Sequence, residues 1–152
     1  MTLFVRYRQK SLVLSSVAAA TLALVACGGG GYDTTSATIT GVAATGAALG
    51  NAAVTGQCST GVPVTATTGA DGSFTLALSG GQTTPCLLEV FGGTPAIRLH
   101  GFAAEAGRAN ITPLTELAMA NSLKTITPQA AFDNFTPVNA STLKLGIEAA
   151  KT

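Results

Sequence analysis

The chain has 152 residues, which allows one modest domain with appendages, and only 10% of its residues are charged. Lys and Arg form no cluster in the body of the chain, so the electrostatic signature of a nucleic-acid-binding protein is missing. Beyond residue 27 the chain has one His and two Cys, fewer than the four ligands that a structural zinc site normally has. We therefore expect no metal, no other cofactor and no nucleic-acid partner.

The N-terminus has the pattern of an export signal. Residues 1–10 carry three basic side chains and no acidic one, and residues 11–26 carry no charge. This uncharged run is shorter than the roughly 20 residues that a membrane-spanning helix needs. A basic segment followed by a short apolar segment is typical of a secretory signal peptide, which we assign to residues 1–26.

The end of this segment is more specific. Leu24-Val25-Ala26-Cys27 resembles the lipobox of bacterial lipoproteins, in which small residues precede a cysteine. The resemblance implies cleavage before Cys27, a diacylglycerol on its sulfur and acylation of the new amino group, so that a lipid bilayer is a partner. The alternatives are an ordinary secreted protein cut near Ala26 and an uncleaved anchor. Without residues 1–26 the chain keeps five basic and seven acidic residues, a net charge of −2.

Residues 27–35, CGGGGYDTT, are predicted to be a glycine-rich tether that holds the domain away from the membrane. Position 29 is Gly, whereas in enterobacterial lipoproteins Asp at this distance after the cysteine signals retention in the inner membrane. The resemblance therefore implies a cell-envelope protein on the outer membrane rather than the inner one.

Residues 36–107 have the pattern of a small β-domain. Short runs rich in Val, Thr and Ile alternate with glycines, as in strands joined by tight turns. The predicted fold class is mainly β: a small antiparallel β-sandwich of about six to seven short strands, followed by a short α-helical C-terminal region. A partly open barrel is the alternative. The predicted strands are residues 37–44, 52–58, 62–68, 73–79, 86–92 and 96–102.

One region is predicted in more detail. Large apolar side chains alternate with small or polar ones in residues 73–79, which predicts that one face of this strand is buried. The core-facing side chains are Phe74, Leu76 and Leu78. Asp71-Gly72 supplies turn chemistry just before this strand, and the pattern predicts a β-hairpin over residues 62–79.

This region also resembles a known family. Gly41-Val42, residues 46–54 and residues 68–76 match the G-x-V strand, the "G.al.gA.V" segment and the "T..dG.F.l" text of carboxypeptidase-regulatory-like, transthyretin-like domains. The resemblance covers about residues 36–102 and implies a β-sandwich, with almost nothing implied about activity. Hydroxyisourate hydrolases of the transthyretin-like group use several His and Arg and a C-terminal motif, which this chain does not have.

Cys58 and Cys86 remain as a pair if Cys27 carries lipid. An even number of cysteines in an oxidising envelope compartment favours a disulfide. Strand alternation lets both side chains point into the same core, so we predict that they are bonded to each other. The alternative is two buried free thiols.

No catalytic arrangement is identifiable, and we expect that the chain is not an enzyme. His100 is predicted to lie on the same strand face as Arg98, exposed to solvent. No acidic residue can be assigned as its partner, and no G-x-S-x-G nucleophile motif is present. Asp71 is assigned to turn geometry rather than to calcium, which takes six to eight oxygens.

Residues 108–152 change to helical patterning. Three Thr-Pro pairs each place a capping hydroxyl before a proline at the first helical position. They are Thr112-Pro113, Thr127-Pro128 and Thr136-Pro137. The first two predict helices over residues 113–124 and 128–135, and Asn139 competes with the third pair as the start of a helix over residues 140–151.

The faces of these helices are also predicted. The apolar stripe of the first helix is expected at Leu114, Leu117, Ala118 and Asn121. Phe132 and Phe135 should form a small core against the sandwich, with an exposed interface as the alternative. Residues 108–123 resemble the text that follows such sandwich domains in larger bacterial lipoproteins, where the helical region continues, and we expect a truncated or vestigial tail.

These features favour a membrane-anchored envelope lipoprotein whose sandwich is a non-catalytic structural or interaction module. One alternative is a glycan- or peptide-binding surface module, for which Phe91 and Phe102 are the aromatic candidates. Another is an enzyme fragment that lacks its catalytic C-terminal part.

Overall fold

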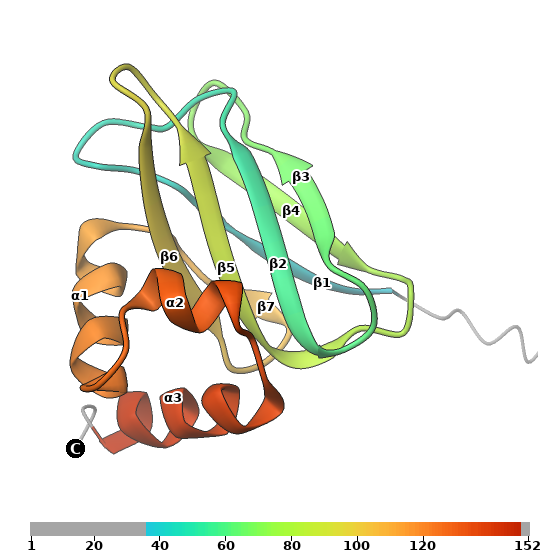
Figure 1. Ribbon diagram of the computed structural model, residues 1–152. Coiled ribbons are helices and arrows are strands. Elements are labelled where there is room, and N and C mark those ends of the chain that lie inside the picture. The colour runs from blue at the N-terminus through green and yellow to red at the C-terminus, as the bar shows by residue number, and fades with distance from the viewer. Residues whose placement is uncertain (1–35, 150–152) are drawn as a thin grey trace, which may run out of the picture. The chain divides into compact units, whose positions relative to one another are not determined.

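The computed structural model describes residues 36–149 (Figure 1). The predicted signal peptide, the predicted tether and the predicted lipidation site Cys27 lie outside the described residues. The strands of the described part are β1 (Ala37–Val42), β2 (Ala53–Thr60), β3 (Val64–Thr67), β4 (Ser73–Leu78), β5 (Thr83–Gly92), β6 (Ile97–Ala103) and β7 (Gly107–Arg108). The helices are α1 (Pro113–Leu123), α2 (Pro128–Asp133) and α3 (Pro137–Ala149).

The strands form two sheets, which confirms the predicted mainly β sandwich with a helical C-terminal region. One sheet has the order β4-β1-β7, and the other has the order β3-β2-β5-β6. Neighbouring strands are antiparallel except for β1 and β7, which pair in parallel. The sequence pattern predicts six of the strands and misses β7, because two residues are too few to show an alternation.

The predicted hairpin over residues 62–79 is wrong. β3 pairs with β2 and β4 pairs with β1, so the two strands belong to different sheets. The turn between them has the expected chemistry, since Gly72 has φ +76° and Asp71 Oδ1 accepts a hydrogen bond from the Ser73 amide at 3.0 Å. It carries the chain across the sandwich because both strands turn apolar side chains toward the same core. The hairpins are β2–β3 and β5–β6.

The core between the sheets contains the predicted apolar face of β4. Phe74, Leu76 and Leu78 are all buried there. Cys58 of β2 and Cys86 of β5 lie opposite each other in the same core and form a disulfide, which confirms the predicted pair. The bridge joins two neighbouring strands of one sheet.

Each helix begins at a proline, as the first two Thr-Pro pairs predict for α1 and α2. Thr112 caps α1, since its hydroxyl accepts from the Thr115 amide at 3.3 Å and the Thr115 hydroxyl accepts from the Thr112 amide at 2.8 Å. The Thr127 hydroxyl caps α2. α3 starts at Pro137, so the competing start at Asn139 is not used. Within residues 36–149, no helix combines the length and the apolar character that crossing a membrane requires.

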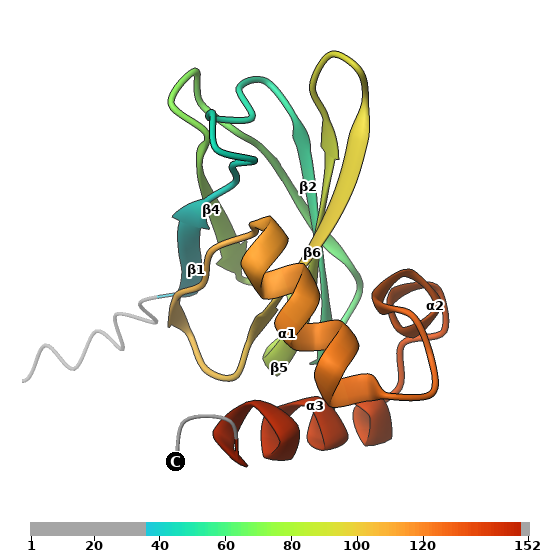
Figure 2. The same cartoon turned by 90° about the vertical axis from the view of Figure 1, so that its left-hand side faces the viewer.

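The helices pack against the four-stranded sheet. Figures 1 and 2 show α1 beside the edge strand β6, α2 over the outer face of the sheet and α3 across one end. A second apolar cluster lies between the helices and the sheet, which confirms the expected small core under the helical tail. Its buried members are Leu87, Met119, Leu123, Ala131, Phe132 and Leu143, with Phe102 and Phe135 packed against them.

The apolar stripe predicted for α1 is wrong. Leu114 and Leu117 are 74% and 66% exposed, whereas Met119 is buried. Thr115 and Glu116 face β6 because they hydrogen-bond to it. These polar contacts and the burial of Met119 and Leu123 go together with a rotation of the helix that leaves the predicted stripe in solvent.

Candidate functional site

His100 is buried, and the expectation of a solvated side chain is wrong. The residue lies on the outer face of β6 and is 2% exposed, because α1 and α2 cover this part of the sheet. The Phe132 ring of α2 packs against the imidazole, with the ring centroids 5.8 Å apart. Alternation in the strand could place His100 on a face but could not show that a helix covers that face.

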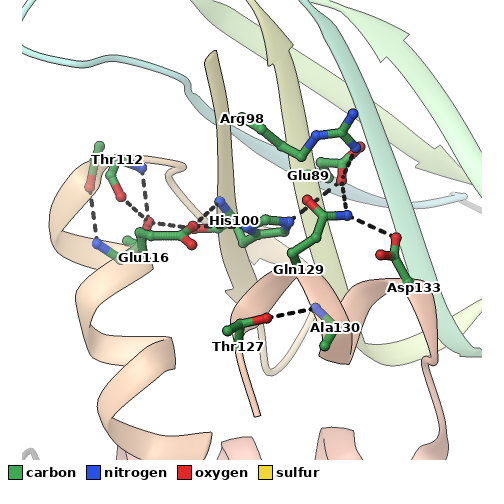
Figure 3. A network of polar contacts seen from close by, with 10 residues as sticks. Glu89, Arg98, His100, Thr112, Glu116, Thr127, Gln129, Ala130 and Asp133 are labelled. Atoms are coloured by element: carbon green, nitrogen blue, oxygen red, sulfur yellow. Dashed lines mark hydrogen bonds and ion pairs between the residues drawn. The ribbon is translucent and has the colours of Figure 1, made fainter.

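Two carboxylates flank the imidazole (Figure 3). Glu116 Oε2, from α1, is 2.9 Å from His100 Nδ1 and accepts a hydrogen bond from the His100 amide at 2.5 Å. Glu89 Oε2, from β5, is 3.5 Å from His100 Nε2, a nitrogen that is buried without a hydrogen-bond partner among the described residues. A ring protonated on both nitrogens would therefore face a carboxylate on each side.

Only one of these two partners of His100 could have been inferred from the sequence. Glu89 and His100 are directly opposite in the β5–β6 register, so pairing those two strands as a hairpin would have brought them together. Glu116 reaches His100 because α1 folds back along β6, a tertiary relationship that no local pattern shows.

Glu89 joins this pair to the second helix. Arg98 Nη1 lies 2.8 Å from Glu89 Oε2, and Gln129 Nε2 lies 3.3 Å from the same oxygen. Gln129 also donates to Asp133 Oδ1 at 2.8 Å. The Glu89 side chain is 11% exposed, so its charge is compensated in a partly dry environment.

We call Glu89, Arg98, His100, Glu116 and Gln129 the polar network. It connects β5, β6, α1 and α2, and its histidine is shielded from solvent by Phe132. In the part of the chain that the structure describes, no group of three or more His, Cys, Asp and Glu is placed to hold a metal ion. The chemistry that this arrangement supports is the fastening of the helices to the sheet by charge-assisted hydrogen bonds.

The two aromatic candidates for a ligand platform are in different environments. Phe91, on the outer face of β5, is 47% exposed, and the Arg98 guanidinium carbon is 4.9 Å from its ring centroid. Phe102 packs against the apolar cluster beneath the helices. Phe91 is therefore the more exposed of the two, with Arg98 stacked on its ring, whereas Phe102 is partly buried.

Asp71 is engaged in its turn. Its Oδ1 accepts hydrogen bonds from the Ser73 hydroxyl at 2.6 Å and from the Ser73 amide at 3.0 Å. These bonds, with the hydroxyl as the larger cause, hold the pKa of Asp71 below its ordinary value. The contacts agree with its assignment to turn geometry.

Comparisons with protein-family models, with curated proteins and with solved structures find no match to this chain. The resemblance to carboxypeptidase-regulatory-like domains and the lipobox at Cys27 therefore stay predictions from the sequence.

Proposed function

We propose that the chain is a cell-envelope lipoprotein, held in the outer membrane by acylated Cys27, whose β-sandwich is a non-catalytic structural or interaction module of the carboxypeptidase-regulatory-like type. The observation that carries the second half of this proposal is the polar network. Its histidine and carboxylates are the side chains best suited to acid–base chemistry. Their hydrogen bonds and ion pairs instead hold α1 and α2 against the sheet.

The anchor rests on the order of features along the sequence. A basic segment, an uncharged segment, a small-residue lipobox and a glycine tether follow one another over residues 1–35. Each buried methylene of an acyl chain contributes about 0.8 kcal/mol, so several chains on Cys27 would hold the protein firmly in a bilayer.

The module character rests on how rigidly the described part is built. The disulfide ties β2 to β5, one apolar core fills the space between the sheets, and a second core fixes the helices. A scaffold of this kind presents a fixed surface, which suits a structural or binding role.

The anchor is tested by labelling cells with a radioactive fatty acid and separating their membranes. We expect label on the wild-type chain, recovery of that chain in the outer-membrane fraction, and loss of both in Cys27→Ala. An unlabelled wild-type chain, or equal recovery of both proteins in the soluble fraction, would refute the anchor.

The non-catalytic role is tested separately with His100→Gln, whose amide N–H can still donate to one of the two carboxylates. Cells that depend on the chain for an envelope phenotype should be rescued by this variant as far as its measured folded population allows. A variant that is folded like the wild type but fails to rescue would show that the imidazole itself is needed, and would contradict the proposal.

A further inference from the structure

One edge of the three-stranded sheet is open. β4 pairs with β1 along one side, and within residues 36–149 no strand pairs with its other side (Figure 1). An edge strand presents a row of backbone donors and acceptors that can pair with another chain.

The β1 hydrogen bonds show which groups of β4 are open. The Thr40 carbonyl oxygen accepts from the Ala109 amide at 2.8 Å, so Thr40 turns its backbone groups toward β7 and away from β4. Thr75 lies opposite Thr40 in the antiparallel ladder. The backbone groups of two opposite residues either both point toward each other or both point away from each other. Thr75 therefore directs its N–H and C=O to the open side. Ala77, two residues on, does the same.

The open segment begins after Ser73. The Ser73 amide donates to Asp71 Oδ1 at 3.0 Å, and the Ser73 carbonyl oxygen accepts from the Gly69 amide at 2.8 Å. The turn thus uses both backbone groups of Ser73, the first residue of β4. Thr75 and Ala77 are left with two donors and two acceptors.

The other sheet edges have features that hinder pairing with another chain, and β4 lacks them. α1 lies beside β6, β7 has two residues, and β3 has four residues and follows Pro63. β4 has six residues, SFTLAL, with no charge and no proline. Natural edge strands that avoid association usually carry such a feature.

We propose that β4 pairs with β4 of a second copy of this chain, antiparallel, with Thr75 of one copy opposite Ala77 of the other. In this register Thr75 and Ala77 of one copy lie opposite Ala77 and Thr75 of the other. Each of the two pairs forms two N–H···O=C hydrogen bonds, four in all. Leu76 lies opposite its own copy, so the contact is two-fold symmetric and closes on itself. The pairing joins the two three-stranded sheets into one continuous sheet.

A second copy fits this edge better than a charged partner strand. β4 has no charged side chain, so its own copy meets no like charge across the interface. In the register with Thr75 opposite itself, Ala77 would face Ser73, whose backbone groups the turn already uses. Of these two registers, the one through Leu76 satisfies the open backbone groups of both Thr75 and Ala77.

The test compares two double variants of the full lipidated chain in detergent, with masses measured by light scattering and sedimentation after subtraction of the detergent. In Thr75→Lys/Ala77→Lys the new lysines would face each other across the interface, whereas in Thr75→Lys/Ala77→Glu each lysine would face a glutamate. Both positions are exposed in the single copy, so neither variant disturbs the pairing of β4 with β1.

We expect two copies per particle for the wild type and for Thr75→Lys/Ala77→Glu, and one copy for Thr75→Lys/Ala77→Lys at the same concentration. A single-copy wild type would overturn the proposal, whether or not a strand of another protein takes the edge. Two copies in all three proteins would also overturn it, because a different surface would then be responsible. Loss of the pair in both variants would overturn the register.

Discussion

Glu89 and His100 lie directly opposite each other on β5 and β6, with Glu89 Oε2 3.5 Å from His100 Nε2, beneath the helices that follow the sandwich. Glu116 of α1 binds the other ring nitrogen, and Gln129 of α2 binds Glu89. Both helices are thus fastened to one cross-strand pair. This relationship makes the helical tail part of the domain rather than an appendage to it.

Removal of the Glu116 carboxylate should weaken this attachment. In Glu116→Ala the amide and Nδ1 of His100 lose their shared acceptor while the residue stays buried. An unsatisfied buried polar group costs about 1–3 kcal/mol, so we expect the free energy of unfolding to fall by that amount in urea titrations. Glu105→Ala is the matched control, since Glu105 is exposed, and it should change stability by less than about 0.5 kcal/mol. Equal effects of the two substitutions would mean that the network adds nothing to stability.

The disulfide should be a large part of the stability of this small domain. Cys58 and Cys86 are 28 residues apart in sequence, and the chain-entropy treatment gives about 3–4 kcal/mol for closing such a loop. We therefore expect Cys58→Ala/Cys86→Ala to unfold at markedly lower urea concentration than the oxidised wild type. A reducing agent should destabilise the wild type and leave the double variant unchanged. A double variant as stable as the oxidised wild type would disprove this contribution.

The sequence predicts what depends on short-range patterns and misses what depends on long-range pairing. Alternation places Phe74, Leu76 and Leu78 correctly in the core, and cysteine parity gives the disulfide. The same alternation cannot say which strand lies beside which, because a turn between sheets and a hairpin turn use the same Asp-Gly chemistry.

The candidate site was harder to predict for a related reason. A single His beside an Arg on a strand has the pattern of a solvated surface, and only the position of α1 and α2 over that face buries it. The helix α1 turns Glu116, Thr115 and the buried Met119 toward the rest of the domain, which leaves two leucines of the predicted stripe in solvent. Hydrophobic periodicity alone therefore chose the wrong face of that helix.

The turn aspartate gives a prediction for pH. The pKa of Asp71 is lowered in the folded chain by the Ser73 hydroxyl and amide, so its hydrogen bonds stabilise the fold above the unfolded pKa. That contribution should be lost as the pH falls through the lowered folded pKa. A titration of the Asp71 carboxyl followed by NMR should show a midpoint below the ordinary value, and Ser73→Ala should raise it. Ser73→Thr keeps the hydroxyl and serves as the control; a midpoint that is the same in all three proteins would contradict the assignment.

The two faces of α1 can be told apart by truncating one side chain on each. Met119 is 1% exposed in the cluster beneath the helices, whereas Leu117 is 66% exposed. Met119→Ala should lower the free energy of unfolding by about 2–5 kcal/mol, because it removes buried contacts and leaves a cavity. Leu117→Ala should change it by less than about 0.5 kcal/mol, since an exposed side chain loses little on truncation. Urea titrations of the two variants decide the matter, and a larger loss for Leu117→Ala would mean that the helix packs by the stripe its sequence suggests.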